Sequence, residues 1–271
     1  MSTPTPHATR IIVAANGARH SKDHHPHLPI TAQEMAIEAQ QCVAAGASMI
    51  HLHARDANGV HSLAVEENRE VYQMVKQAVG DQALVQLTTE AVGRYSPEQQ
   101  MALVDTLQPE ATSLALAELI PSPESEPLAA AFFQRLAKQN TLVQYILYTP
   151  EQVREYGALR QRGTILDSPH HLLIVLGRYQ QHQQSHPQDL DAFMPLLSDI
   201  AVPWAVCAFG AQEQACLCYA ASLGADVRVG FENNLFDEHG QLAASNASQV
   251  AALKRALAQR GIEVVTHPTW P

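Results

Sequence analysis

The sequence predicts a single (β/α)₈ barrel that spans residues 1–271. Three observations lead to this prediction. Short apolar runs with strand character alternate with amphipathic helical segments, the alternation repeats eight times, and no stretch is left over for a second domain. Apolar strands that alternate with helices are typical of a parallel sheet covered by helices. A length of about 250 residues is usual for such a sheet closed into a barrel.

The strands are predicted from short runs rich in apolar and β-branched residues. These runs are Ile11–Ala15, Ser48–His53, Ala83–Thr88, Ala111–Leu116, Leu142–Leu147, Leu172–Leu176, Trp204–Ala208 and Asp226–Val229.

The helices are predicted from apolar residues at helical spacing. The first covers Thr31–Ala45: Thr31 and Glu34 have the spacing of a capping box, and Gly46 ends the helix. The second covers Glu66–Val79 and ends at Gly80. The other helical stretches lie at about 97–106, 127–139, 150–162, 188–199, 211–223 and 245–260.

An open doubly wound sheet is the alternative fold. In that fold a glycine-rich phosphate loop of the form G-x-G-x-x-G commonly follows the first strand. Here the first strand is followed by Ala15–Arg19, which reads Ala-Asn-Gly-Ala-Arg. The closed barrel is therefore preferred.

The charge balance excludes one broad class of function. The chain has 17 Lys and Arg against 27 Asp and Glu, a net charge of −10. Nucleic-acid binding needs a basic surface, so it is not expected as the main function. With 46% hydrophobic and 16% charged residues, the chain has enough apolar side chains for a large core.

The sequence also predicts a cytoplasmic protein that does not bind membranes. No apolar run reaches the ~18–20 residues that cross a bilayer. The polar start, Met1–Arg10, lacks the apolar segment of a secretory signal. Four cysteines are too few for a disulfide scaffold, so all are expected as reduced thiols in the core.

His51 and His53 give the strongest chemical signal. They stand two apart at the end of the second strand, so both side chains point to one face. In a barrel, the carboxyl ends of the strands carry the active site. Two imidazoles on one face form half of a divalent metal site. The alternative is a pair of rim histidines that bind no metal.

A second signal lies at the end of the eighth strand, where Arg228, Gly230 and Glu232 share one face. Barrel closure places the first strand between the eighth and the second, so these two are roughly 10 Å apart. Two His and one Glu with an open position form the ligand set of a catalytic zinc site. The alternative for Glu232 is a simple ion pair with Arg228.

Two further groups are candidates for substrate contacts. Thr88 and Ser113 carry hydroxyls that could hold a carboxylate, although ordinary strand residues would look the same. Glu90 is either a catalytic acid or base or a solvated loop residue. The loop Arg19–His27, rich in imidazole and cationic groups, is long enough to act as a lid and is expected to contact substrate.

These residues resemble the motifs of the β-keto acid cleavage enzymes, and the likeness covers most of the chain. The matching segments are Asn16–Ala18, Leu28–Thr31, Ala45–Asp56, Pro109–Ser113 and Arg228–Asn234.

The resemblance implies a (β/α)₈ barrel, usually a homodimer or homotetramer, that holds one divalent metal. The metal would be zinc or another divalent ion bound by His51, His53 and Glu232. Family members condense a β-keto acid with acetyl-CoA, giving acetoacetate and a new CoA thioester. The resemblance gives Arg228 a role in proton removal and anion binding, and makes Thr88 and Ser113 substrate contacts.

The chain departs from the family pattern at three places. Arg19 and Asn233 stand where characterised members have acidic residues, and Glu90-Ala91 replaces a glycine pair. Arg19 would repel an amino-bearing substrate and could hold a second carboxylate, so a neutral or acidic keto acid is expected. Asn233 cannot accept a proton as Asp can, and Glu90 is the candidate to supply that acidic function.

Two other functions are weighed against this one. Amidohydrolase-type hydrolases also use His-x-His on a barrel strand, but on the first strand and with an aspartate after the last. A binding protein that kept the metal and lost turnover would also fit the replaced acidic positions. For the oligomer, the apolar residues Val264, Val265 and Trp270 are expected at a subunit interface.

Overall fold

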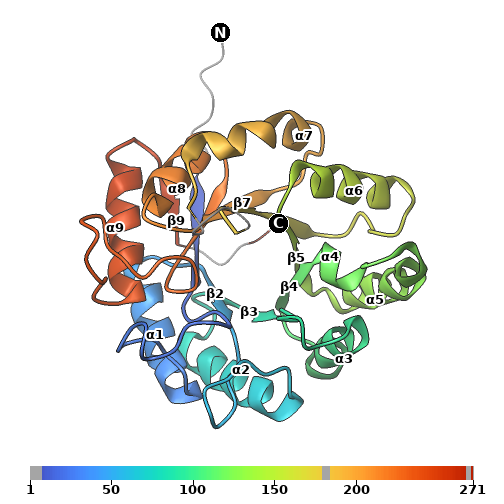
Figure 1. Ribbon diagram of the computed structural model, residues 1–271, viewed down its shortest axis with the longest axis horizontal. Coiled ribbons are helices and arrows are strands. Elements are labelled where there is room, and N and C mark those ends of the chain that lie inside the picture. Colours follow the sequence, from blue (N-terminus) through green and yellow to red (C-terminus); the bar gives the residue numbers. More distant parts are fainter. Residues whose placement is uncertain (1–7, 179–183, 267–269, 271) are drawn as a thin grey trace.

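A computed structural model describes residues 8–178, 184–266 and 270. In Figure 1 a ring of helices encloses the strands. Within the described residues, the strands are β1 (Thr9–Ala14), β2 (Met49–Leu52), β3 (Leu84–Thr88), β4 (Ala111–Ala115), β5 (Leu142–Leu147), β6 (His170–Leu176), β7 (Trp204–Ala208), β8 (Asp226–Val229) and β9 (Val264–Val265).

At least one helix lies between each strand and the next from β1 to β9. The helices are α1 (Ala32–Ala45), α2 (Val65–Val79), α3 (Pro97–Leu107), α4 (Leu116–Leu119), α5 (Glu126–Gln139), α6 (Pro150–Gln161), α7 (Met194–Ser198), α8 (Glu213–Ser222) and α9 (Asn246–Ala258), with short 3₁₀ turns at Pro123–Ser125 and Pro187–Ala192. Two of them, α4 and α5, lie between β4 and β5.

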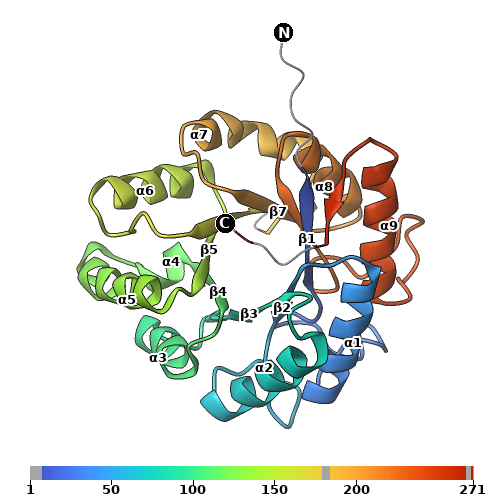
Figure 2. The ribbon, with the colours of Figure 1, turned by 180° about the vertical axis from the view of Figure 1, so that it is seen from behind.

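The sheet is closed, which makes the alternative of an open sheet wrong. Strand β1 pairs in parallel with β2 on one side and with β8 on the other. Ile12 is the partner of both Met49 and Arg228. The strands from β2 to β8 pair in sequence order, so the ring is complete (Figure 2).

The capping box of α1 forms as predicted. The Thr31 hydroxyl accepts a hydrogen bond from the Glu34 amide at 3.2 Å, and the Glu34 carboxylate accepts one from the Thr31 amide at 3.0 Å. Gly46 ends the helix with a φ of 123°. One predicted helix is wrong: residues 188–199 divide into a 3₁₀ turn and α7. Pro195 lies in the first turn of α7, where its missing N–H interrupts a longer helix.

The two faces of the sheet carry different side chains. Ile11, Val13 and Ile50 point outward and pack with the helices in the main core. Alternate residues point into the barrel, where Ile12 and Met49 belong to a smaller apolar cluster. His51 follows Met49 on that inner face and brings an imidazole into the barrel toward the carboxyl ends of the strands.

The C-terminal residues have partners within the chain. Val264 pairs with Thr9, and Val265 with Arg10. The Trp270 ring lies 5.2 Å from the Arg10 guanidinium and 5.3 Å from the His171 ring. The structure thus gives these residues contacts within the chain, and their part in a subunit interface stays a prediction.

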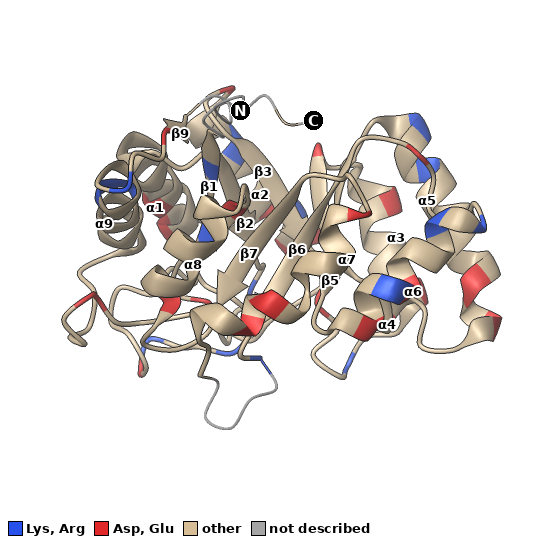
Figure 3. Ribbon diagram, turned by 90° about the horizontal axis from the view of Figure 1, so that it is seen from above, with Lys and Arg blue, Asp and Glu red and all other residues tan. Residues whose placement is uncertain are grey.

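Charges of both signs are spread over the helices and loops (Figure 3). Among the described residues, none of the helices has both the length and the apolarity that a bilayer crossing requires. All four cysteines are free and buried, as predicted. Residues 1–7, most of the polar start on which the prediction of no secretory signal rests, lie outside the described residues.

Candidate metal centre and active-site cavity

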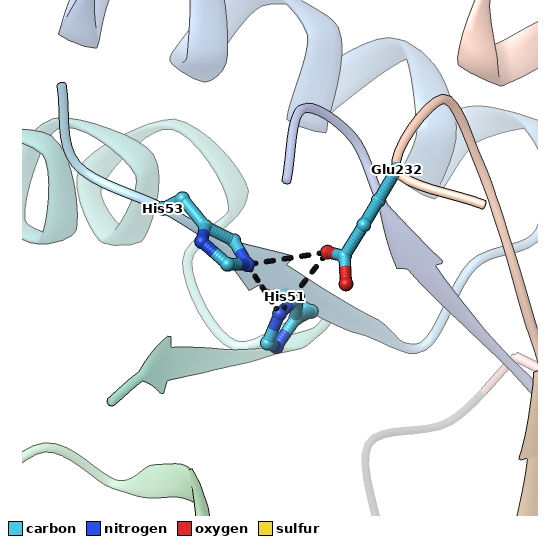
Figure 4. A group of neighbouring side chains, drawn as sticks. All are labelled: His51, His53 and Glu232. Atoms are coloured by element: carbon cyan, nitrogen blue, oxygen red, sulfur yellow. Dashed lines mark hydrogen bonds and ion pairs between the residues drawn. The ribbon is translucent and has the colours of Figure 1, made fainter. Parts of the chain in front are cut away.

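His51, His53 and Glu232 converge at the carboxyl ends of the strands (Figure 4). His51 is an inner-face residue of β2, and His53 follows the strand by one residue. Glu232 comes from the loop after β8, on the far side of β1. Its backbone N–H bonds to the Ala14 carbonyl at 3.1 Å, which fixes this loop against the end of β1.

The distances between the three candidate ligand atoms fit a cation with tetrahedral coordination. His51 Nε2 and His53 Nε2 are 3.0 Å apart. Glu232 Oε2 lies 3.3 Å from the first nitrogen and 3.2 Å from the second. With zinc–ligand bonds of about 2.0–2.1 Å, tetrahedral ligand atoms are separated by about 3.3 Å. Within the described residues, Glu232 Oε2 is buried with no hydrogen-bond donor, as expected of an atom that receives a cation.

The positive groups around Glu232 keep its carboxylate ionised, the form that binds a metal. Burial alone would raise its pKa, but Arg228 and the two histidines hold this pKa well below the ordinary value. Arg228 Nη2 donates to Glu232 Oε1 at 3.0 Å and leaves Oε2 to face the imidazoles. Burial also lowers the pKa of His51, which favours the neutral imidazole that a metal requires.

Gly17 is required for the position of Glu232. Its φ is +58°, and a Cβ there would lie 2.6 Å from Glu232 Cγ. We expect Gly17→Ala to move the carboxylate and weaken zinc binding by about 10–100-fold, the range seen when partners of a metal ligand are lost. Zinc affinity measured by chelator competition checks this.

Gly80→Ala is the matched control for this prediction. Gly80 has a φ of +56° but nothing within 4 Å of a Cβ, so the two variants share backbone strain and differ in the contact with Glu232. Equal zinc affinities for the two variants would contradict the prediction.

A cavity opens from the three candidate ligands. Its polar wall contains Thr88, Ser113 and Arg228, and its apolar wall contains Ile146 and Phe209. The remaining lining residues are His51, His53, Glu90, Ala115, Glu118, Tyr148, Val175, Arg178 and Glu232.

Predicted site residues fall into two groups. Thr88, Ser113, Glu90 and Arg228 line the cavity, whereas Arg19 and Asn233 do not. Asn233 is 5% exposed, and its side-chain amide has no hydrogen-bond partner among the described residues.

Comparison with known proteins assigns the chain to a protein family. The sequence profile of the β-keto acid cleavage enzymes matches residues 9–269. The chain belongs to the β-keto acid cleavage enzyme family. This confirms the predicted enzyme class and the family resemblance.

Curated relatives cover nearly all of this β-keto acid cleavage enzyme. The 3-keto-5-aminohexanoate cleavage enzyme of Fusobacterium nucleatum subsp. nucleatum is 27% identical over 94% of this chain and 93% of its own. The 3-oxoadipate:acetyl-CoA acetyltransferase of Cupriavidus necator is 27% identical over 90% of this chain and 87% of its own.

Solved structures confirm the (β/α)₈ barrel. A ternary complex of ObcA with a C4-CoA adduct and oxalate has a TM-score of 0.70 at 19% identity, covering 89% of this chain and 66% of that one. A type I 3-dehydroquinate dehydratase from Clostridium difficile has a TM-score of 0.61 at 11% identity, covering 95% and 96% of the two chains.

Arg178 is a cavity residue of this family member that the sequence reasoning missed. It follows β6 by two residues, so its place after a strand end was a usable signal. Its Nη2 donates to Glu90 Oε1 at 2.9 Å, and its guanidinium lies 5.6 Å from the Phe209 ring. Arg19 Nη2 is 3.8 Å from the same Glu90 oxygen. Glu90 is therefore held by cations, and the alternative of a solvated loop residue is wrong.

The loop Arg19–His27 of the β-keto acid cleavage enzyme packs on its own barrel. The buried His25 ring lies 4.1 Å from the Phe231 ring, and its Nε2 lies 2.8 Å from the Ala243 carbonyl. Arg55 donates to the carbonyls of Gly17 and His20 at 2.6 and 3.0 Å. None of the loop residues lines the cavity described above, in contrast to the expected substrate contact.

Cys207 has a polar neighbour that could not be predicted from the amino-acid sequence. Arg228 Nη2 lies 3.4 Å from Cys207 Sγ as well as contacting Glu232. Burial raises the pKa of Cys207 to about 11, so the thiol stays protonated. It packs against the guanidinium and helps to fix its direction.

Proposed function

We propose that this enzyme binds one zinc ion, or another divalent ion, through His51, His53 and Glu232. With it the enzyme condenses a β-keto acid with acetyl-CoA and releases acetoacetate and a new acyl-CoA. The acyl group on the keto side of the substrate leaves on CoA, and the acetyl group takes its place, so the atoms balance. One observation carries the proposal: three buried ligand atoms, each 3.0–3.3 Å from the others, face a cavity.

The residues around the metal have separate tasks. A bound divalent cation would polarise the keto carbonyl and stabilise negative charge on the adjacent carbon. Arg228 is buried, and its Nε has no hydrogen-bond partner among the described residues, so it can contact the same anion. The Ser113 hydroxyl is also buried without such a partner and is suited to the substrate carboxylate. Thr88, whose hydroxyl accepts from the Glu90 amide at 3.1 Å, lies beside it on the cavity wall.

Glu90 is proposed as the acid or base. Its Oε2 lies 3.9 Å from His53 Nδ1, on the edge of the metal centre. We expect Glu90→Gln to lower kcat by about 10²–10⁴-fold, the usual contribution of a positioned acid or base, with zinc binding kept. Steady-state kinetics at a fixed zinc load checks this, with the exposed Glu155→Gln as control. Unchanged kcat would remove Glu90 from the chemistry.

Arg178, in the cavity wall beside Glu90, favours a neutral or acidic keto acid. Arg178 Nη2 pairs with Glu90 Oε1 at 2.9 Å and also interacts with the Glu118 carboxylate on the cavity wall. Arg19 Nη2 is 3.8 Å from the same Glu90 oxygen. Arg178 lines the cavity and takes over the role first expected of Arg19, that of meeting a second carboxylate. The Asn233 amide does not reach the cavity, so it is not proposed as a proton acceptor.

A substrate panel tests the proposal. The zinc-loaded enzyme is incubated with acetyl-CoA and with 3-oxoadipate, 3,5-dioxohexanoate or 3-keto-5-aminohexanoate, and new CoA esters are measured by mass spectrometry. We expect turnover, with the amino-bearing acid slowest. Bound metal without any new ester across the panel would reject the reaction and favour a metal-retaining binding protein. Family membership already sets the amidohydrolase alternative aside.

The remaining expectations concern the setting of the enzyme. We propose a cytoplasmic enzyme that acts on small molecules as a homodimer or homotetramer, as the family resemblance implies. Light scattering on the purified protein measures the assembly.

A further inference from the structure

A line of hydrogen bonds crosses the barrel interior and ends on His51. It starts at Asp226 near the amino end of β8, and each side chain along it is buried. The contacts are Asp226 Oδ2 to His171 Nε2 at 3.0 Å, His171 Nδ1 to Gln144 Nε2 at 2.9 Å, Gln144 Oε1 to Gln86 Nε2 at 3.3 Å, and Gln86 Oε1 to His51 Nδ1 at 2.8 Å.

The chemistry of Asp226 sets the direction of this line. An ionised carboxylate only accepts, so His171 must donate from Nε2. With its proton on Nε2, His171 offers the lone pair of Nδ1 to the Gln144 amide nitrogen, which lies 2.9 Å away. Each glutamine donates from its nitrogen and accepts on its oxygen.

The last contact of the line fixes the proton of His51. Gln86 offers its oxygen to His51, so the proton of that ring sits on Nδ1. Nε2 then presents its lone pair toward Glu232 and His53.

We propose that Asp226 is a positioning residue that sets the tautomer of His51 through His171, Gln144 and Gln86. The inference rests on the proposed metal role of His51. A histidine that binds a metal through Nε2 needs its proton on Nδ1, and the partner of Nδ1 decides this. Here that partner is an amide, which can face either way, so its orientation has to be imposed from elsewhere. The only obligate acceptor on this line is the carboxylate of Asp226.

Asp226→Asn reverses the line without changing its shape. The Arg10 backbone N–H donates to Asp226 Oδ1 at 2.7 Å, and the Arg10 guanidinium is 3.5 Å from Oδ2. Because the backbone contact is the shorter one, we expect an asparagine to keep its oxygen at the Oδ1 position and to turn its nitrogen to His171. His171 would then accept on Nε2 and donate from Nδ1. Both glutamine amides turn over in response, and the Gln86 nitrogen faces His51. The proton of His51 moves from Nδ1 to Nε2, where it blocks the metal.

The test detects the position of the His51 ring proton directly. Nitrogen-15 NMR of the imidazoles in metal-free protein reports which ring nitrogen is protonated, independently of zinc and of turnover. We expect a proton on His51 Nδ1 in the unmodified protein and no proton there in Asp226→Asn. Zinc affinity, measured by chelator competition, is expected to fall by about 10–100-fold in the variant.

A second substitution restores the tautomer. Adding Gln86→Glu to Asp226→Asn places an obligate acceptor next to His51 and keeps the number of carboxylates equal. Gln144 can then donate to that carboxylate and accept from His171, so every group on the line keeps a partner. We expect the double variant to regain both the Nδ1 proton and zinc binding. If Asp226 served only barrel stability, a substitution at residue 86 would not correct the defect of Asp226→Asn.

Thr112→Val is the matched control, because it removes another buried hydrogen bond of the barrel, the one from Thr112 Oγ1 to the Leu87 carbonyl at 3.0 Å. It should leave the His51 proton in place. If Asp226→Asn does not fold, Gln144→Met interrupts the line away from Arg10 and should give a mixture of His51 tautomers.

Three results would overturn the inference: a doubly protonated His171 in the unmodified protein, an unchanged Nδ1 proton in Asp226→Asn, or no rescue by Gln86→Glu. Failure of the proposed reaction looks different, since the tautomer would respond as expected while the keto-acid panel gives no product.

Discussion

Glu232→Gln is expected to abolish zinc retention during dialysis and to reduce turnover at least about 100-fold. This loss exceeds the one usually seen when a residue that only hydrogen-bonds to a metal ligand is replaced. The amide is neutral, so the charge that offsets the cation is lost while the size of the side chain is kept. Glu232 also supplies one of the three ligand atoms, so the remaining histidines form half a site. Metal content by elemental analysis, together with turnover, measures both effects.

Glu238→Gln is the control for this variant, since Glu238 is an exposed carboxylate on the same loop. It should keep its zinc. Full zinc occupancy in Glu232→Gln would contradict the proposed ligand set, whatever its activity.

Arg228→Met is expected to lower the free energy of unfolding by about 3–5 kcal/mol, the usual cost of removing one partner of a buried ion pair. Arg228 is 3% exposed, and its guanidinium contacts both Glu232 and Cys207. Without it, the carboxylate keeps its burial and loses its main positive neighbour, so the pKa of Glu232 should rise. Urea-induced unfolding checks the change in stability.

The surface pair Arg135–Asp105 provides the control. Arg135 is 43% exposed in its side chain, so Arg135→Met should cost about 0–1 kcal/mol. Arg228→Lys keeps the charge and should recover much of the stability. We expect it to stay about 10²–10³-fold low in kcat, because one ammonium cannot hold both neighbours and the substrate anion. Equal stabilities for the two Met variants would contradict this reading.

The sequence was sufficient to bring His51, His53 and Glu232 together, because their arrangement follows simple rules. His51 and His53 share a face through the two-residue period of a strand. Glu232 joins them through barrel closure, which puts β8 and β2 on either side of β1. Both rules act without any knowledge of side-chain packing.

The inner hydrogen-bond line could not be predicted in the same way. Gln86 and Gln144 look like ordinary strand residues, and His171 meets Asp226 only because β6, β7 and β8 have a particular register. The place of Arg19 outside the cavity lining could not be predicted for a related reason. Its loop packs against Phe231 and Ala243, far along the chain, and this packing decides where the arginine points.

The positions of the two tryptophans have a practical consequence for studying this enzyme. Trp204 is the first residue of β7, and Trp270 lies beside His171 near the start of β6, so both residues lie toward the barrel end opposite the candidate metal site. Intrinsic fluorescence will accordingly follow loss of structure at that end. It will respond little to ligands entering at the mouth, whose binding calls for calorimetry or an optical label.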